Sequence, residues 1–587
     1  MNSHLLQNNR KLYAALLLCA GFIAGAPNTT YAQSNVEKVG ASSQRITVTG
    51  IVNDAEGPVI GASVRDKANP QTGAVTDIDG KFSISVPAGS TLIISYVGCD
   101  PQEVVATAGA PLDIMLNPSS ALLDEVVVVG FGTQKKVNLT GSVSVADQKA
   151  LSERPVVSAA QALQGVVPGL QITQGDGKLE TNASIQIRGN GTIGDGSSGS
   201  PLIFIDGMEG DINTLNPQDI ESISVLKDAA AASIYGSRAP FGVILVTTKK
   251  GAQGKATINY NNSFRFSNLV NRNHTMDSKT FALFFDDACC NVPGWGPHFS
   301  KDTLEKIIAY QNGTYDPDGD GIFDPLNTMD DIWGNGNWQD VPFHGGGYAN
   351  TDWFSEIYKD HNFSQEHNLS VNGGTENFNY YFSANFLDQG GMLKWGDEGL
   401  KRYGLTGKFN VDITKWMEFG FSHRWVRRDY VRPSKLTDGL YDNLGRQGWP
   451  VIPIYDPNGN IFDCPSPING LENGGSDRAQ TDRNYTQLSL IFRPLKGWDI
   501  HAEFNYRVYS DQRHWDTQKL YGHDVDGNPF EISSGSHVHE EYTRENFYNL
   551  NIYSNYDWTL NEKNNFHFML GFQTEDMKQT KMGYQRD

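Results

Sequence analysis

Residues 376–388 read ENFNYYFSANFLD, with an apolar side chain at every second position. Phe378, Tyr380, Phe382 and Phe386 share one face of an extended chain, because successive side chains of a β-strand point to opposite sides. The opposite face is largely polar. This period of two predicts a long β-strand with one apolar and one polar face.

The same alternation recurs along the C-terminal half of the sequence. It is found in KRYGLTGKFNVDIT (401–414), KGWDIHAEFNYRVY (496–509), YNLNIYSNYDWTL (548–560) and NNFHFMLGFQ (564–573). Each stretch has about ten residues or more, the length of a tilted strand that crosses an outer membrane, whereas strands of soluble sandwiches usually have about five or six. Long polar insertions at 277–362 and 428–483 alternate with short turns, as at the two ends of a membrane barrel. We therefore expect a mainly β protein in which residues 252–587 form part of an antiparallel transmembrane β-barrel with extracellular loops.

The first 32 residues predict export. Arg10 and Lys11 precede an apolar run at 12–24, which is too short for a membrane-spanning helix, and small residues stand at the two positions that a signal peptidase reads. We expect residues 1–32 to be a signal peptide that is cleaved after Ala32. No later segment is long and apolar enough for a transmembrane helix, and an exported chain of this kind is either soluble or a β-barrel.

Two further units are expected before the barrel. Short alternating strands between Gly, Pro and Asp turns predict a β-sandwich over residues 46–117. Residues 133–251 combine strands such as ASIQIRG and GVILVTTKKG with two short helices, the second capped by Asp228 and closed near Gly236. This second unit is therefore predicted to be an α+β domain.

A linker at 118–132 joins these two units and contains LDEVVVVGFG (123–132). Proline and serine upstream mark it as a tether. An extended β-branched segment without a sheet of its own is suited to adding a strand to the sheet edge of another protein. The same pattern also fits a closing strand of the preceding sandwich, because a short apolar run between turn signals describes a core strand as well.

Composition and motifs exclude several classes of function. A formal net charge of −20 gives no electrostatic reason to bind a phosphate backbone, so we expect no nucleic-acid partner. The stretch GNGTIG at 189–194 has the spacing of a dinucleotide fingerprint, but the following DGSSGSP cannot form the helix that such a site requires. No grouping of nucleophile, base and orienting acid stands out, and we expect no enzymatic activity.

Taken together, the motifs resemble those of the SusC/RagA family of TonB-dependent outer-membrane transporters. The resemblance rests on LDEVVVVGFGTQKK, SAAQALQGVVPGLQI, IQIRGNG, PLIFIDGMEG, LNPQDIESISVLKDAAAASIYGSR and HNLSVNGGTENFNYYFSANFLDQGG. The sandwich resembles a carboxypeptidase regulatory-like domain of transthyretin-like fold through GIVNDAEGPVIGASV and GAVTDIDGKFSI. The two resemblances together run from residue 46 to the end of the sequence.

The family resemblance implies a mechanism. The linker would hold a TonB box that joins the sheet of periplasmic TonB, which works with ExbB and ExbD and is energised by the proton gradient. The implied box consists of Asp124, Glu125, Val126, Val127, Val128, Val129 and Gly130. Residues 133–251 would be a plug domain that fills a barrel of about 22 strands. A surface lipoprotein of the SusD type would cover the mouth, the cargo would be an oligosaccharide or, less often, a peptide, and no cofactor is required.

The resemblance also assigns a role to two plug arginines. Arg188 and Arg238 stand at positions whose arginines pair with barrel carboxylates in related transporters, and a desolvated pair would hold the plug until force is applied. The alternative is an ordinary surface arginine. Pro240 and Phe241 depart from the family pattern in the turn that follows Arg238.

A calcium site is one interpretation of DPDGDGIFD. This stretch places Asp316, Asp318, Asp320 and Asp324 at the spacing of a calcium-binding loop, but the twelfth position is Asn327 where such loops carry a bidentate glutamate. The sequence thus fits either a Ca²⁺ site in an extracellular loop or a solvated acidic turn.

Other loop residues have weaker functional interpretations. His537 and His539 lie on one face if their segment is extended, although two ligands alone are weak grounds for a metal site. The aromatic rings of Trp295, Trp333, Trp338 and Trp353 suit stacking on sugar rings or packing in a loop core.

Two alternatives to nutrient import remain at this point. One is a surface glycan-binding or adhesion protein that does not transport, and the other is a siderophore or cobalamin receptor with the same mechanism. The sequence offers nine or ten candidate barrel strands, and a sheet left open would expose unpaired backbone groups to lipid. We therefore expect this sequence to be a fragment of a longer transporter or a truncated product.

Overall fold

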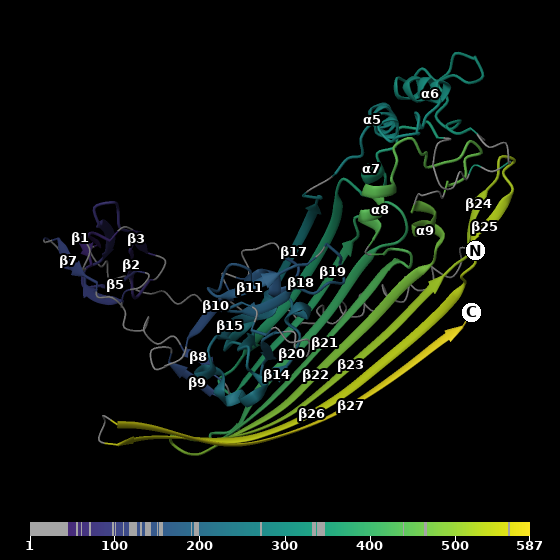
Figure 1. Cartoon of the computed structure of the whole chain (residues 1–587). Coiled ribbons are helices and arrows are strands. Elements are labelled where there is room, and N and C mark those ends of the chain that lie inside the picture. The colour runs from purple at the N-terminus through teal and green to yellow at the C-terminus, as the bar shows by residue number, and fades with distance from the viewer. Residues whose placement is uncertain are drawn as a thin grey trace, which may run out of the picture. The chain divides into compact units, whose positions relative to one another are not determined.

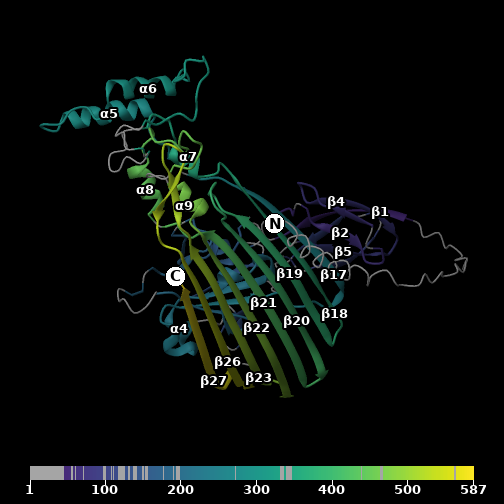
Figure 2. The same cartoon turned by 90° about the vertical axis from the view of Figure 1, so that its right-hand side faces the viewer.

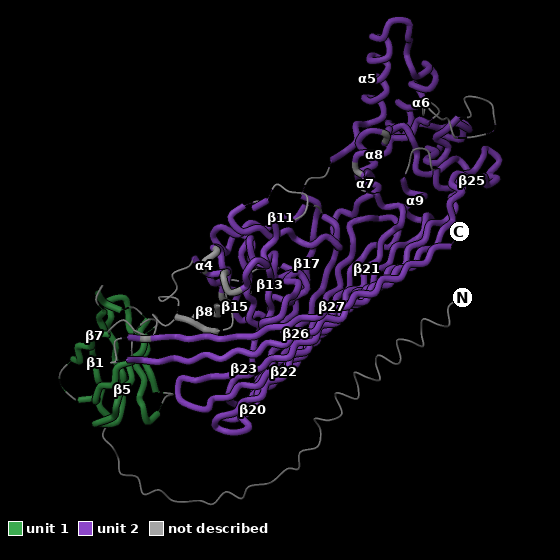
Figure 3. Tube along the Cα trace, turned by 60° about the horizontal axis from the view of Figure 1, so that its bottom comes forward, with its two compact units in different colours: residues 1–124 green, residues 125–587 purple. Residues whose placement is uncertain are grey.

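The computed structural model describes residues 45–586 with gaps. The gaps are 55–56, 60, 70–71, 97–98, 100, 108, 110, 117–125, 130–131, 136–141, 149–150, 152–155, 176, 190, 193–198, 271–272, 331–335, 337, 339–346, 438, 463–466 and 561–563. The chain forms two compact units, residues 1–124 and 125–587 (Figure 3). The predicted signal peptide, residues 1–32, lies outside the described residues.

The first unit is a small β-sandwich, as predicted. Its strands are β1 (Arg45–Asn53), β2 (Ser63–Asp66), β3 (Gly73–Val75), β4 (Lys81–Pro87), β5 (Thr91–Ser95), β6 (Gln102–Val105) and β7 (Leu112–Met115). They form two sheets with the strand orders β4-β1-β7 and β3-β2-β5-β6. Alternate residues of both sheets, such as Val48, Ile84 and Ile94, are buried in one shared core. The period of two in the sequence is therefore the pattern of inward and outward side chains.

The valine run belongs to the second unit and is paired within its own chain. Strand β8 (Val126–Val129) runs antiparallel to β9 (Gly132–Lys135), with Val126 opposite Lys135 and Val129 opposite Gly132. The expectation that this segment has no sheet of its own is wrong, because β9 is close enough in sequence to pair with it. The alternative, a closing strand of the sandwich, is also wrong, because the described sandwich sheets contain only β1–β7.

The α+β domain of the second unit is called the plug below and spans residues 142–251. Its strands are β10 (Val143–Asp147), β11 (Leu170–Thr173), β12 (Ser184–Ile187), β13 (Leu202–Ile205), β14 (Met208–Glu209), β15 (Ile220–Leu226) and β16 (Val243–Thr248). Its helical turns are α3 (Ala159–Leu163), α4 (Ala229–Ala232), η3 (Ile212–Thr214), η4 (Pro217–Asp219) and η5 (Ser233–Arg238). The main sheet has the order β10-β15-β16-β13-β14, and its buried core includes Ile205, Ile223 and Val246. The predicted cap is present, since Asp228 Oδ1 accepts the N–H of Ala231 at 2.8 Å.

The rest of the second unit is dominated by one large sheet, called the wall below. It contains β17 (Gly254–Ser267), β18 (Asn362–Gly374), β19 (Phe378–Gly390), β20 (Gly399–Thr414), β21 (Met417–Pro433), β22 (Ser476–Leu495), β23 (Trp498–Thr517), β26 (His537–Leu560) and β27 (Asn564–Arg586). Neighbours in this order pair antiparallel along the whole sheet. Figure 1 shows the wall curving around the plug, and Figure 2 shows its strands side by side.

The two faces of the wall differ in the way the sequence predicts. On the convex face, Phe382, Leu405 and Ile552 are 43–51% exposed, whereas their neighbours in sequence point toward the plug. One boundary prediction was wrong, because the expected insertion at 428–483 contains the end of β21 and the beginning of β22. Charged residues occur on both faces of those strand ends, so they lack the regular alternation that marks a strand in a sequence.

Helical segments cover one end of the wall. They contain α5 (Ser278–Cys290), α6 (Lys301–Gln311), α7 (Trp353–Ile357), α8 (Leu440–Gln447) and α9 (Ile468–Asn473), and a hairpin of β24 (Leu520–His523) and β25 (Pro529–Ser533) lies at the same end (Figure 1). The segments after β17 and after β21 share a core that includes Phe299, Trp353 and Leu444. Among the described helices, none has the length and apolar character that crossing a bilayer requires.

Candidate functional site

Charged side chains on the inner face of the wall reach the plug at several levels. The described pairs are Lys408 with Asp206, Arg483 with Asp211, Arg432 with Glu180 and Glu575 with Arg238. In three of these four pairs the wall supplies the cation and the plug supplies the carboxylate. The sequence analysis expected the reverse arrangement, in which Arg188 and Arg238 of the plug supply the cations and the barrel supplies the carboxylates.

The most deeply buried pair joins Asp206 to Lys408. Asp206 follows β13 in the tight turn to β14, where its φ of 50° is accommodated by a residue with a short polar side chain. Its carboxylate accepts the backbone N–H of Thr248 at 2.9 Å, the hydroxyl of Thr248 at 2.7 Å and the ammonium of Lys408 at 2.9 Å. Lys408 lies on β20, so a side chain of the wall completes a hydrogen-bond network that ties β13 to β16 inside the plug.

The surroundings of Asp206 keep it charged. Burial by itself raises the pKa of a carboxyl group, but the Lys408 ammonium and the Thr248 N–H outweigh this effect and hold the pKa of Asp206 below its usual value. The side chains of Lys408 and Asp206 are 11% and 16% exposed. Removing one partner of such an ion pair is strongly destabilising, because the remaining charge stays buried without a partner.

A second pair lies where the plug continues into η3. Asp211 caps this turn by accepting the N–H of Asn213 at 2.9 Å, and its other oxygen accepts from Arg483 of β22 at 2.6 Å. Burial raises the pKa of Asp211, but Arg483 and Asn213 lower it further than burial raises it, so the net shift is downward. Arg483 also lies over the ring of Tyr509, with 5.4 Å between the guanidinium carbon and the ring centre.

A third group is built around Arg432 near the end of β21. Arg432 binds Glu180 of the plug at 2.7 Å and Asp477 of β22 at 3.0 Å, and Asp477 also accepts from Arg513 at 2.6 Å. Glu180 of the plug thereby joins an ion-pair network whose other members all belong to the wall.

Wall arginines also bind backbone carbonyls of the plug. Arg402 donates to the carbonyl of Val157 at 2.9 Å, and Arg265 donates to the carbonyl of Val156 at 3.5 Å. Both guanidinium groups bind Glu366 of β18. Each still has buried N–H groups without a partner among the described residues.

The two arginines singled out from the sequence have different positions. Arg238 donates to both carboxylate oxygens of Glu575 on β27 at 2.9 Å and to Glu209 of the plug at 2.5 Å. Arg188 has a φ of 58° and an exposed side chain, and no carboxylate of the described residues lies within ion-pair distance of it. The predicted plug–barrel contact thus exists at Arg238, whereas the described part of the chain provides none at Arg188. That these two arginines hold the plug until force is applied stays a prediction.

Sequence reasoning missed Lys408, Arg483 and Arg432. The alternation of β20, β21 and β22 places each of them on the polar face and so marks them as inward-facing. Nothing in the sequence pattern identifies their plug partners, because Asp206 and Lys408 are 202 positions apart.

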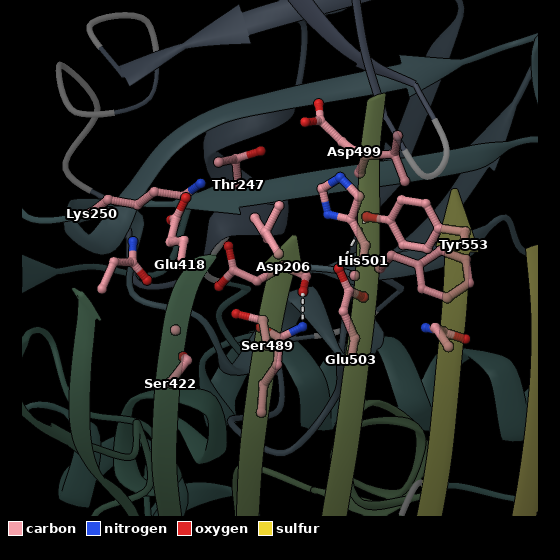
Figure 4. Close-up of a pocket in the computed structure, with 18 of the residues that line it drawn as sticks. Asp206, Thr247, Lys250, Glu418, Ser422, Ser489, Asp499, His501, Glu503 and Tyr553 are labelled. Carbon is pink, nitrogen blue, oxygen red and sulfur yellow. Dashed lines mark hydrogen bonds between the residues drawn. The ribbon is translucent and has the colours of Figure 1, made fainter. Parts of the chain in front are cut away.

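A cavity of about 620 Å³ lies between the plug and the inner face of the wall. The plug contributes β13 and β16, and the wall contributes Glu418, Asp499, His501, Glu503 and Tyr553 (Figure 4). The His501 ring stacks on the Tyr553 ring with 4.5 Å between their centres, and the Tyr553 hydroxyl donates to Glu503 at 3.1 Å. Its lining combines charged side chains such as Glu418 and Glu503 with apolar ones such as Phe204 and Leu245, and both the plug and the wall contribute to it.

The tryptophans proposed for sugar stacking have different surroundings. Trp353 is 1% exposed and donates its indole N–H to the carbonyl of Trp449 at 2.9 Å, so it is a core residue of the segments above the wall. Trp338 packs against the same core, and Trp333 lies outside the described residues. Only Trp295 presents a largely exposed side chain, at 65%.

The aspartates of the predicted calcium loop bind backbone amides. Asp316 accepts the N–H groups of Gly319 and Gly321 at 2.8 Å, and Asp324 accepts that of Leu326 at 2.9 Å. Among the described residues no three or more His, Cys, Asp or Glu side chains gather as metal ligands, and this includes Asp318 and Asp320. The turn is therefore stable as an acidic turn, and calcium binding stays a prediction.

The two histidines near the start of β26 lie close to aromatic partners. The His539 ring stacks on the Trp515 ring at 4.3 Å between centres, and the His537 ring lies edge-on to His539. No third metal-ligating group joins them in the described part of the chain.

The predicted TonB box is described only in part. Val126 to Val129 form β8, while Asp124, Glu125 and Gly130 lie outside the described residues. The box role stays a prediction.

Comparison with known proteins places these features in a family context. Residues 135–243 match the TonB-dependent Receptor Plug Domain, and residues 48–128 match the CarboxypepD_reg-like domain. The TonB-dependent receptor SusC of Bacteroides thetaiotaomicron is 34% identical over 368 residues, which cover 61% of this chain and 31% of that protein. The TonB-dependent receptor P39 of Formosa agariphila is 28% identical over 554 residues, which cover 92% of this chain and 47% of that protein.

Among solved structures, the fold resembles that of the RagAB peptide importer in the open-open state. The TM-score is 0.63 at 24% sequence identity, and the match covers 78% of this chain and 50% of that chain. This chain therefore spans between about a third and a half of the length of these relatives.

Proposed function

Because this chain is a SusC/RagA-like TonB-dependent receptor, with the plug, the regulatory-like domain and the antiparallel wall of that class, we propose that it imports a nutrient across the outer membrane. The cargo is an oligosaccharide, the plug closes the passage at rest, and TonB supplies the force that moves the plug. A SusD-like lipoprotein on the outer surface works with the receptor. The chain carries out no enzymatic reaction.

One observation carries the proposal: a plug with its own hydrophobic core is bound to the inner face of the wall through ion pairs. A wall with an apolar convex face and a polar concave face matches a barrel between lipid and a water-filled lumen. Buried pairs such as Asp206 with Lys408 and Asp211 with Arg483 keep the plug seated against thermal motion. Opening this passage therefore requires work, which is what an energised transporter receives from the proton gradient.

The choice of cargo is supported by the relatives. SusC of Bacteroides thetaiotaomicron is among the proteins most similar in sequence, whereas the RagAB structure is that of a peptide importer at lower identity. We favour an oligosaccharide because of the SusC-like sequence, and peptide import is the competing result of the uptake assay.

The role of TonB is tested at β8. Proline has no N–H to donate to a β-ladder, so Val127→Pro blocks strand addition at the predicted box, whereas Val127→Thr retains a β-branched residue. We expect Val127→Pro to abolish uptake of a labelled oligosaccharide mixture by cells that lack the native copy, and Val127→Thr to leave it unchanged. A protonophore is expected to abolish uptake by the unaltered receptor and by Val127→Thr.

A matched control separates the box from the hairpin. Gln134 lies opposite Val127 on β9, so Gln134→Pro disrupts the same pairing without changing the box. We expect uptake to persist in Gln134→Pro cells. Uptake that survives Val127→Pro, with the receptor present in the outer membrane, would refute TonB-driven import and favour a binding protein that does not transport.

A further inference from the structure

Six cations form a continuous strip on the inner face of three neighbouring strands of the wall. They are Arg402 and Lys408 of β20, Arg424, Arg428 and Arg432 of β21, and Arg483 of β22. The strand register places them one above another. Lys408 is opposite Ser422, Arg424 is opposite Tyr485, Arg402 is opposite Arg428, and Arg432 is opposite Asp477. We call this set the cation ladder.

The cation ladder is long and carries little opposing charge of its own. From Ser422 to Arg432 the strand advances by ten residues, which is about 34 Å at about 3.4 Å per residue. Over that height the inward-facing positions of these three strands hold six cations and a single carboxylate, Asp477. This strip is strongly basic in a chain whose formal net charge is −20.

At rest, the plug neutralises the ladder. Asp206 binds Lys408 at 2.9 Å, Asp211 binds Arg483 at 2.6 Å and Glu180 binds Arg432 at 2.7 Å. Three of the six cations thus bind plug carboxylates, and one of them, Arg432, also binds Asp477 of the wall at 3.0 Å.

The other three cations bind no plug carboxylate among the described residues, and Arg402 is paired with Glu366 of β18 at 3.4 Å. Arg428 donates to the amide oxygen of Asn182 at 3.3 Å, and Arg424 stacks over the Tyr485 ring at 4.3 Å. Arg424 is 7% exposed and Arg402 is 4% exposed, and both have buried guanidinium N–H groups with no partner in the described part of the chain. These N–H groups can donate to an anionic or carbonyl oxygen.

Displacement of the plug removes the compensating charges from this side of the lumen. A row of cations in a confined lumen concentrates anions, because low-dielectric walls focus its field. An anionic cargo would replace the carboxylates that leave with the plug. A neutral cargo would leave Lys408 and Arg483 without their carboxylates, whereas Arg402 and Arg432 keep Glu366 and Asp477 of the wall. Bidentate binding of carboxylate and sulfate groups is the characteristic chemistry of arginine.

We propose that the cation ladder selects a cargo that carries repeated carboxylate or sulfate groups, an acidic oligosaccharide, and guides it along the wall when the plug moves. This inference rests on the proposed import function and names the chemical class of its substrate. Tyr430, Tyr485 and Tyr509 stand among the cations on the same inner face, and flat aromatic faces suit sugar rings. The combination of aromatic faces with guanidinium groups favours an acidic sugar over an acidic peptide.

Ion selectivity provides the first test. The receptor as the cell makes it, and a variant lacking plug residues 135–243, are purified from outer membranes and inserted into planar bilayers under a KCl gradient. We expect the plugless variant to pass chloride in preference to potassium. Arg424→Gln with Arg428→Gln should reduce this preference toward or below unity. These two arginines bind no plug carboxylate among the described residues, so the double substitution can also be placed in the intact receptor.

The matched control changes the same number of cations on the opposite face. Lys401 of β20 and Arg478 of β22 are exposed and alternate with the ladder residues, so Lys401→Gln with Arg478→Gln should leave the selectivity of the plugless variant unchanged. The proposal would be overturned if the plugless variant preferred potassium, or if its preference for chloride did not change with Arg424→Gln and Arg428→Gln.

Cargo class is tested by competition in intact cells, which also covers the case in which the plugless variant does not fold. Hexagalacturonate, a sulfated hexasaccharide, neutral maltohexaose and hexaglutamate compete for TonB-dependent uptake of a labelled acidic oligosaccharide mixture. We expect one of the two acidic sugars to compete best, which identifies carboxylate or sulfate as the preferred group, and Arg424→Gln with Arg428→Gln to weaken that competition. Equal competition by maltohexaose overturns the class, and stronger competition by hexaglutamate replaces the sugar with an acidic peptide.

The import mechanism and the role of the cation ladder can be refuted separately. Uptake that does not depend on TonB, together with an anion-selective plugless variant, would overturn the import mechanism but not the role of the cation ladder. TonB-dependent uptake of neutral sugars, together with an unselective plugless variant, would overturn the role of the cation ladder but not the import mechanism.

Discussion

At the scale of single residues, burial decides which contacts hold the plug. Arg238, which the sequence singled out, binds Glu575 with side chains 44% and 30% exposed, and an ion pair so open to water contributes only about 0–1 kcal/mol. Lys408 and Asp206 are 11% and 16% exposed, so their interaction is little screened and the loss of either partner is severe. The principal contact is therefore one that the sequence did not identify.

Replacing Lys408 by methionine should loosen the plug. The substitution leaves the Asp206 carboxylate buried without its cation, and we expect the plug to lose about 3–5 kcal/mol of stability against urea, read from its susceptibility to protease. Adding Asp206→Asn should recover most of the loss, because the uncompensated charge is then gone. Arg238→Ala is the comparison, and a larger loss there than in Lys408→Met would show that the wrong pair has been identified.

Acid should release the plug through Asp206. Its pKa in the seated plug lies below the usual value of 3.8, so its contribution to stability is complete above about pH 4 and is lost as the pH falls through the lowered pKa. Asp219 acts in the opposite direction. Burial raises the pKa of its carboxyl group, although this group accepts a hydrogen bond from the Tyr381 hydroxyl at 2.7 Å. Protonation of Asp219 therefore favours the seated plug. We expect urea titrations between pH 7 and pH 3 to show stability falling only at the acid end, and Asp206→Asn to reduce that decline, with Asp211, whose pKa is also lowered, carrying part of the remainder. An unchanged decline in Asp206→Asn would assign it to other carboxylates.

Residue-scale predictions from the sequence were limited by distance along the chain. Periodicity marks Lys408 and Arg483 as inward-facing, but pairing depends on how the plug sits in the wall, and the partners come from another domain. A local motif was more informative, since Asp228 caps its helix as predicted because both partners lie within three residues.

At the scale of elements, the wall shows what periodicity can and cannot predict. Strands such as β19 and β20 were predicted from alternate aromatic residues, because one face meets an apolar surrounding and the other does not. The ends of β21 and β22 were missed, because charged residues on both faces interrupt the alternation. The β8–β9 pairing was missed for a different reason: an apolar run between turns fits several kinds of strand.

The connection between plug and wall allows an element-scale test at Gly251. A Cβ at this position would overlap backbone atoms of Tyr380 on β19, and backbone cannot move aside as a flexible side chain can. We expect Gly251→Ala to destabilise the seated plug by about 1–3 kcal/mol, as overpacking does, measured by the same urea assay. Gly177→Ala is the control, because a Cβ there meets no atom within 4 Å. Equal stability of the two variants would contradict the close packing of this connection.

At the scale of the whole molecule, charge is distributed unevenly. The chain is acidic overall, while the inner face of β20 to β22 is basic and the plug supplies carboxylates to it. This arrangement unites the two proposals, because the pairs that seat the plug are also the groups that its displacement exposes to cargo. Everything in this account depends on the wall standing between lipid and lumen.

That dependence is tested most directly by spin labels placed one at a time along β23. Cysteines at positions 500 to 512 of the receptor in liposomes are labelled and their collisions with oxygen and with a water-soluble nickel complex are measured. We predict that Ile500, Ala502, Phe504, Tyr506 and Val508 favour oxygen, that His501, Glu503, Asn505 and Arg507 between them do not, and that oxygen preference ends at Ser510 and Gln512. Labels on both faces that are equally protected from oxygen and nickel, with no period of two, would show that β23 lies in a protein core and would contradict the account.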